Sequence, residues 1–264
     1  MRIYLTPVSN DTQRAIPEAT KFSLSFDGQP ATITSLTSAK DEKLLFALLL
    51  DASGSNASIG DSTKAVAAQI FEKLSAMGGQ GYLVIFKDRV FISQHTLSSE
   101  EVKTALAPVR FSKGTSLLDA IQKTCEQPLS RQNNPAVSRK IIVLLTDGED
   151  SASTATREQA IQSAQKAGVS IFSMNTLSGH PEMMSLSEHR HAQALFEQVS
   201  GETGGQWFST TLDKSATDLL NAINDQWVLS FLAPPHSDGK LHALQLRFAE
   251  RGMRLTYTPE IGLP

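Results

Sequence analysis

The chain has 264 residues, of which 40% are hydrophobic and 19% are charged, which is enough apolar material for a full globular core. Its formal net charge is −3 and it has no Lys/Arg cluster, which argues against nonspecific binding of nucleic acid. No apolar run reaches the ~20 residues that a membrane-spanning helix needs, so the pattern predicts no span.

The pattern of the N-terminal flank predicts antiparallel strands. Phe22, Leu24 and Phe26 alternate with serines, as in a strand with one buried face. Asp27-Gly28 can turn the chain, and Ile33 begins a returning strand.

An unbroken apolar run follows, from Leu44 to Leu50, and predicts a parallel strand that is covered on both faces. Asp51, Ser53 and Ser55 come directly after it. In open parallel sheets, the loops that leave the carboxyl ends of the strands form the binding crevice. Grouped hard oxygen atoms suit Mg²⁺, Mn²⁺ or Ca²⁺, although Asp and Ser are also ordinary turn and capping residues.

The next elements are an amphipathic helix and a hairpin. The apolar spacing predicts a helix over 61–77 that ends at a Gly-Gly pair. The strands expected at 82–86 and 90–93 have a connection too short for a parallel crossover, so we expect them to pair antiparallel at one edge of the sheet. Ser98 and Glu101 have the spacing of a capping box at a further helix start.

A second polar loop opens the following helix. Thr115 follows a glycine and can offer its hydroxyl, while Ser116 and Asp119 have the spacing of a capping pair. Cys125 falls on the apolar face of this helix, which predicts a buried structural thiol and not a nucleophile. A polar, proline-bearing loop is expected over 128–138.

A second buried strand then runs into acidic residues. Ile141 to Leu145 is wholly apolar and is followed by Thr146, Asp147 and Gly148, which brings a second carboxylate to the same edge. Glu149 and Asp150 come next. They are either ordinary acids of a turn and a helix start, or groups that do not bind the cation but adjust its affinity through the residues that do.

Taken together, Asp51-x-Ser53-x-Ser55, Thr115 after a glycine, and Thr146-Asp147-Gly148 resemble the metal-ion-dependent adhesion site of von Willebrand factor type A domains, over about Leu44 to Asp225. The resemblance implies hydroxyl ligands at Ser53, Ser55 and Thr115, with Asp51 and Asp147 binding the metal directly or through water. It implies Mg²⁺, or else Mn²⁺ or Ca²⁺, and a protein partner that presents Asp or Glu.

The expected fold class is α/β, with a Rossmann-like, mostly parallel sheet, helices on both faces and one antiparallel edge strand. The later elements are helices over 156–167, around 195–199 and around 219–223, and strands over 169–174 and 207–209.

The C-terminal flank again alternates, at Leu244, Leu246 and Phe248. Neither flank has enough strands to be stable alone, so we expect both ends to form one small antiparallel β module, with the α/β domain inserted between them. The expected division is 1–43, 44–226 and 227–264. The flanks also resemble bacterial type-A-related proteins first noticed in acidobacteria, which implies an exported or periplasmic protein whose leader is absent from this sequence.

His180, His189 and His191 stand close together along the chain and suggest zinc. His189 and His191 would diverge on a helix and no cysteine accompanies them, so we predict a solvated loop after the 169–174 strand. Such a loop would border the metal and shape the choice of partner.

The pattern as a whole favours a metal-dependent protein-binding module, for adhesion or assembly. No Gly-x-Ser-x-Gly elbow and no phosphate-binding Gly-x-x-x-x-Gly-Lys loop is present, so we do not expect an enzyme. Two alternatives stay open: a metal-dependent hydrolase, and a scaffold in which the cation is purely structural.

Overall fold

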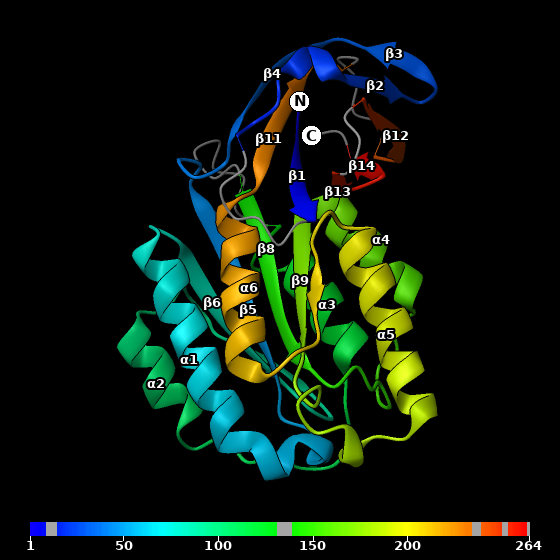
Figure 1. Ribbon diagram of the computed structural model, residues 1–264. Helices are drawn as coiled ribbons and strands as arrows, with labels where there is room; N and C mark the ends of the chain where they lie inside the picture. The colour runs from blue at the N-terminus through cyan, green and yellow to red at the C-terminus, as the bar shows by residue number, and fades with distance from the viewer. Residues whose placement is uncertain (9–14, 131–138, 234–238, 250–252, 263–264) are drawn as a thin grey trace.

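The computed structural model describes residues 1–8, 15–130, 139–233, 239–249 and 253–262. A six-stranded sheet with the order β10-β9-β8-β5-β6-β7 forms its centre (Figure 1). The strands are β5 (Leu44–Asp51), β6 (Gln80–Phe86), β7 (Val90–Ile92), β8 (Arg139–Thr146), β9 (Val169–Asn175) and β10 (Trp207–Phe208). All neighbours are parallel except β6 and β7, which confirms the antiparallel hairpin at one edge.

Helices cover both faces of this sheet, as predicted. One face carries α3 (Leu117–Glu126), α4 (Arg157–Ala167) and α5 (Leu186–Gly201), and the other carries α1 (Gly60–Ala76), α2 (Ser99–Leu106) and α6 (Leu212–Asn224). Alternate residues of β5 enter the two cores, with Leu45 in the first and Phe46 in the second. The unbroken apolar run follows from this burial on both faces.

Several local predictions can be checked against the helices. The Ser98 hydroxyl accepts the Glu101 N–H at 3.3 Å and Glu101 Oε2 accepts the Ser98 N–H at 2.7 Å, so the capping box at the start of α2 is confirmed. Cys125 is fully buried on α3, as predicted, and burial raises the pKa of its thiol. Within the described part of the chain, no helix combines the length and apolarity that crossing a bilayer requires.

The predicted capping pair of α3 is wrong. Ser116 makes no side-chain cap; instead Asp150, from the loop after β8, accepts the Leu117 N–H at 2.9 Å. Asp119 Oδ1 accepts the N–H groups of Thr154 and Ala155 at 3.0 and 2.9 Å. The carboxylates therefore join the loop after β8 to the start of α3 rather than closing the helix locally.

Both ends of the chain contribute to the β module, which confirms this part of the expected fold. Its strands are β1 (Arg2–Val8), β2 (Phe22–Phe26), β3 (Gln29–Ala31), β4 (Ile33–Ser38), β11 (Trp227–Phe231), β12 (Leu241–Phe248), β13 (Arg254–Thr256) and β14 (Glu260–Gly262), with a 3-10 turn, η1 (Ala19–Lys21), before β2. They form two antiparallel sheets, β13-β1-β11-β4 and β14-β12-β2-β3, each with two strands from each end of the chain.

Ile3 and Trp227 from the first sheet share one core with Leu24 and Leu244 from the second. In Figure 1 the module lies at the top, above the end of the central sheet where β8 and β9 begin. The domain boundaries after residues 43 and 226 stay a prediction. Most of the expected loop over 128–138 lies outside the described residues.

A buried arginine joins the module to the α/β domain. Arg139, the first residue of β8, is 2% exposed; its Nε donates to Gln226 Oε1 at 2.9 Å and its Nη1 to the Ala39 carbonyl at 3.3 Å, while Nη2 donates to the Ile223 carbonyl at the end of α6. Gln226 Nε2 donates in turn to the Thr6 hydroxyl at 2.8 Å. Burial lowers the pKa of Arg139 to about 10, so the guanidinium remains charged at neutral pH.

Candidate metal centre

The candidate site lies at the carboxyl end of the central sheet, at the bottom of Figure 1 near the start of α1 and away from the module. β5 and β8 are parallel neighbours, with Leu50 beside Leu145. Asp51 and Asp147 therefore leave adjacent strands at the same edge, as the sequence predicted for two strands that end in carboxylates.

Asp51 and the two serines after it form one hydrogen-bonded turn. Asp51 is fully buried; its Oδ1 accepts the Ser53 N–H at 2.8 Å and its Oδ2 accepts the Thr146 hydroxyl at 2.6 Å. The hydroxyl oxygens of Ser53 and Ser55 lie 3.0 Å apart. Ser53 is buried and Ser55 is exposed, so the row of oxygens runs from the strand end toward the surface.

Asp147 approaches the same turn from β8. Its side chain is 1% exposed; Oδ1 accepts the Glu149 N–H at 3.1 Å and Oδ2 accepts an N–H of Asn56 at 3.3 Å. The next residue, Gly148, has φ +88°, and a Cβ there would lie 2.9 Å from Ala192 Cα. The turn that places Asp147 therefore requires glycine.

Thr115 comes from the predicted polar loop that opens α3. The Ser112 N–H donates to the Ala52 carbonyl at 3.0 Å, and the Thr115 carbonyl accepts the N–H groups of Ser151 and Ala152 at 3.0 and 2.9 Å. These bonds hold the Thr115 loop against the loops after β5 and β8. Within the described parts of the chain, the Thr115 hydroxyl makes no hydrogen bond of its own, so it remains available as a ligand.

The electrostatics of this cluster favour a cation. No Lys, Arg or His of the described segments lies within 4 Å of the Asp51 or Asp147 carboxylate. Burial, and then the charge of Asp147, raise the pKa of Asp51 to about 7. Two buried carboxylates without a positive partner are costly unless one is protonated or a cation lies between them. An all-oxygen donor set fits Mg²⁺, Mn²⁺ or Ca²⁺.

The two acids after Asp147 differ in their surroundings. Asp150 is structural, because its Oδ1 accepts both the Leu117 N–H and the Ser153 hydroxyl, the latter at 2.6 Å. Partial burial, and then the charges of Asp147 and Glu188, raise the pKa of Glu149. Glu149 therefore adds to the negative potential of the site, which leaves it the better candidate of the two for tuning a cation.

The sequence analysis missed Asn56. This residue lies in η2 (Gly54–Ile59), is fully buried, and donates to Ser53 Oγ at 3.2 Å and to Asp147 Oδ2 at 3.3 Å. Its Oδ1 accepts the Thr176 hydroxyl at 2.6 Å. Asn56 thus orients groups from two of the three loops. An asparagine in a serine-rich loop reads as an ordinary turn residue, and Thr176, its own partner, is 120 positions away.

We expect Asn56→Ala to weaken Mg²⁺ binding by about 10- to 100-fold, the usual effect of removing a group that orients metal ligands. Calorimetric titration of Mg²⁺ into chelator-stripped protein measures this directly. Ser58→Ala is the matched control, because Ser58 lies in the same segment, is exposed, and its hydroxyl hydrogen-bonds among the described residues only to Met183 Sδ, at 3.8 Å. Binding within twofold of wild type in Asn56→Ala would show that Asn56 does not support the ligands.

The histidine-bearing segment is more helical than predicted. After η3 (Pro181–Met183), α5 already begins at Leu186, with Ser185 and Glu188 forming its capping box, so His189 and His191 lie on a helix and not in a loop. Among the residues that the structure describes, no three His, Cys, Asp or Glu side chains are grouped as they would be to hold a metal ion. The contact of Met183 with Ser58 places the remaining loop beside η2, next to the serine motif.

Comparisons with known proteins identify the family of the chain. The family model described as von Willebrand factor type A domain matches residues 47–222, which is more than half of the chain. A comparison with curated protein sequences finds no significant match.

Similar folds occur among solved structures. An aerotolerance-related membrane protein from Bacteroides fragilis NCTC 9343 is 18% identical, with a TM-score of 0.52 over 69% of this chain and 98% of the other. Proximal thread matrix protein 1 from the mussel byssus, with a zinc-occupied MIDAS motif, is 16% identical, with a TM-score of 0.54 over 76% of this chain but only 50% of its own. BatB from Bacteroides thetaiotaomicron is 16% identical, with a TM-score of 0.50 over 69% of this chain and 97% of its own.

At these identities the solved structures show the fold alone, whereas the family model matches the sequence across both carboxylate-bearing strand ends. The protein belongs to the von Willebrand factor type A domain family.

Proposed function

We propose that the protein is a metal-dependent protein-binding module, for adhesion or assembly, in which Asp51, Ser53, Ser55, Thr115 and Asp147 hold a divalent cation. The observation that carries the proposal is the pair of buried carboxylates, Asp51 and Asp147, which lack a positive partner among the described side chains and lie beside neutral hydroxyls. The mussel neighbour with a zinc-occupied MIDAS motif supports the idea that this fold can hold a divalent metal.

The donor set suggests how a partner would be recognised. Three of the five proposed ligands are neutral hydroxyls, so if the carboxylates of Asp51 and Asp147 act partly through water, a bound divalent cation would keep positive charge toward solvent. Mg²⁺ prefers six oxygen ligands and usually retains water, so five protein groups leave a position for a carboxylate from outside. The partner would therefore be a protein that presents Asp or Glu. Mg²⁺ is our first choice of metal because every donor is oxygen.

We further propose a binding role rather than catalysis, since the sequence contains neither a nucleophile elbow nor a phosphate-binding loop. The resemblance of the flanks to bacterial type-A-related proteins supports an exported or periplasmic location. Turnover of a phosphoester or peptide substrate that stops in Asp147→Ala would instead favour a metal-dependent hydrolase.

The test is calorimetric titration of Mg²⁺ and Mn²⁺ into chelator-stripped protein. We expect saturable binding in the wild type, a loss of more than about 100-fold in Asp147→Ala because a buried carboxylate ligand is removed, and no change in the control Asp213→Ala. Asp213 is an exposed acid in the first turn of α6. Absence of binding in the wild type, or equal binding in Asp147→Ala, would contradict the proposed site.

The partner chemistry needs a separate measurement. With Mg²⁺ present, the end-capped peptide acetyl-Gly-Glu-Gly-amide should bind and its neutral analogue acetyl-Gly-Gln-Gly-amide should not, and a chelator should abolish the difference. Equal binding of the two peptides would contradict the proposed recognition of an acidic side chain but would not contradict the metal site.

A further inference from the structure

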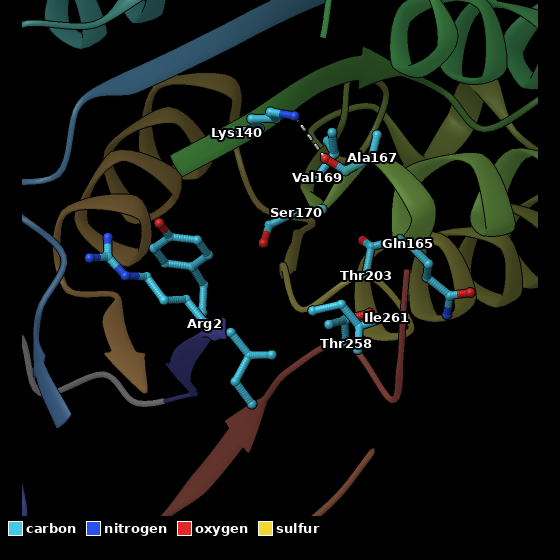
Figure 2. Close-up of a pocket in the computed structure, with 12 residues that line it drawn as sticks. Arg2, Lys140, Gln165, Ala167, Val169, Ser170, Thr203, Thr258 and Ile261 are labelled. Carbon is cyan, nitrogen blue, oxygen red and sulfur yellow. Dashed lines mark hydrogen bonds between the residues drawn. The ribbon is translucent and has the colours of Figure 1, made fainter. Parts of the chain in front are cut away.

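A second candidate site lies at the opposite end of the central sheet, where the β module meets the α/β domain. A cavity of about 200 Å³ is lined there by residues of β1, of the starts of β8 and β9, of the end of α4 and of β14, together with Thr203 and Thr258 (Figure 2). Its walls therefore come from both ends of the chain and from the inserted domain. Cavities between domains are common positions for ligand sites.

Lys140 is the main charged group of this cavity. Its side chain is only partly exposed, and its Nζ donates to the Ala167 carbonyl at 3.1 Å, as Figure 2 shows. Burial lowers the pKa of this ammonium group. In the described chain no carboxylate lies within 4 Å of Lys140 Nζ. A partly buried ammonium group without a negative partner is unusual, because buried charges are normally paired.

Ser170 provides an independent observation. The residue is 5% exposed, yet its hydroxyl makes no hydrogen bond in the described structure. Figure 2 shows its oxygen turned toward the middle of the group of lining residues. A hydroxyl that faces a cavity and has no protein partner is free to hydrogen-bond a group that enters the cavity.

The other charged residue of the lining is Arg2. Its guanidinium already has a negative partner, because Nη1 donates to both carboxylate oxygens of Glu42 at 3.1 Å. Among the residues that the structure describes, no Asp or Glu lines the cavity. Ile3, Val169 and Ile261 supply apolar wall instead. The lining therefore combines one unpaired cation, a free hydroxyl and apolar surface, which suits an anion that carries a hydrocarbon part better than a fully polar anion such as phosphate.

The volume limits the ligand to a small molecule. An engineered apolar cavity of about 150 Å³ in another protein holds benzene, and the present cavity of about 200 Å³ is slightly larger. We propose that the junction cavity binds a small organic carboxylate, whose anionic group pairs with Lys140, to which Ser170 offers a hydrogen bond, and whose apolar part lies against Ile3, Val169 and Ile261. A ligand there would also hold the β module against the inserted domain, because it contacts both.

Ligand-detected NMR titration tests this site, with benzoate and isovalerate as probes and with benzamide and isovaleramide as neutral controls of matched shape. We expect at least one carboxylate to bind saturably at millimolar concentration or below, and its amide to bind at least tenfold more weakly. Equal binding of acid and amide, displacement by equimolar inorganic phosphate, or no binding of either acid would overturn the proposal.

Substitutions locate the binding. Lys140→Met keeps the length of the apolar stem, removes the charge and should weaken carboxylate binding at least tenfold. Lys166→Met is the matched control, because Lys166 is an exposed lysine near the end of α4, beside the cavity-lining residue Ala167, and does not itself line the cavity. Unchanged binding in Lys140→Met would place the ligand elsewhere and overturn the assignment.

Two further variants keep the test decisive if Lys140→Met does not fold, which its circular dichroism and melting temperature would show. Lys140→Arg retains the charge and should retain binding, whereas Ser170→Ala should weaken binding several-fold without removing the charge. The opposite ranking would overturn the proposal. Asp147→Ala should bind the carboxylate normally, so failure at the metal centre and failure at this cavity can be told apart.

Discussion

Chelator-stripped protein is expected to lose stability as the pH rises from about 4 to about 8. Burial and the Asp147 charge raise the pKa of Asp51 from 3.8 to about 7, so the folded state holds a proton that the unfolded chain releases. This contribution is fully present below about pH 4 and is lost as the pH rises through about 7. Three pKa units correspond to at most about 4 kcal/mol, measurable by urea unfolding at a series of pH values.

Asp51→Asn is the matched variant, because the amide has nearly the same shape and cannot titrate. Its unfolding free energy should vary less with pH than that of the wild type, and it should gain little from metal. Saturating Mg²⁺ should restore the stability of the wild type at about pH 8, since a cation can replace the proton between the two carboxylates. The same pH slope in both proteins would show that another group titrates.

Removal of the Arg139 guanidinium should produce the other large effect. In Arg139→Met, Gln226 Oε1 loses its donor in a buried setting, and the carbonyls of Ala39 and Ile223 each lose one donor and keep only backbone N–H donors. Breaking such a buried charged network typically costs about 3 to 5 kcal/mol. Urea unfolding followed by circular dichroism measures the loss.

The control for this substitution is Arg89→Met, since Arg89 is exposed in the β6–β7 turn and makes no side-chain hydrogen bond among the residues that the structure describes. Its unfolding free energy should stay within about 0.5 kcal/mol of wild type. A loss below about 1 kcal/mol in Arg139→Met would mean that water or rearranged side chains satisfy the three acceptors.

The sequence predicted those parts of the fold that depend on residues close together along the chain. The apolar run of β5, the short β6–β7 connection and the Ser98–Glu101 capping box each contain their own signal within a few positions. Ser185 and Glu188 have the same local capping-box spacing, which marks the start of α5. The sequence analysis predicted a loop there, because it considered the histidines only as possible zinc ligands or as exposed polar residues.

Contacts between distant loops could not be predicted from spacing. Asp150 occupies the start of α3 from 33 positions away, and Asp119 holds a backbone 35 and 36 positions further along, so the local spacing of Ser116 and Asp119 was misleading.

At the candidate metal centre, the adjacency of two parallel strands made the meeting of Asp51 and Asp147 predictable, because each residue follows its own buried run. Asn56 was not predictable, since its role depends on Thr176 and Asp147, which reach it only through the folded sheet. The part that Thr115 plays in holding a cation stays a prediction.

The shared sheets of the β module have a consequence for the order of folding. Met1 donates to the Phe231 carbonyl 230 positions along the chain, and β1 and β4 both pair with β11, so these two strands wait for the synthesis of β11 before this partner exists. Until then their hydrogen-bonding edges are open to other chains. Once the α/β domain has folded, it brings Ser38 next to Trp227 and turns a very long chain closure into a short one. The folded α/β domain thus brings its two flanks together so that their strands can pair. A substitution that unfolds its core would therefore also leave the strands of the flanks unpaired and prone to aggregation.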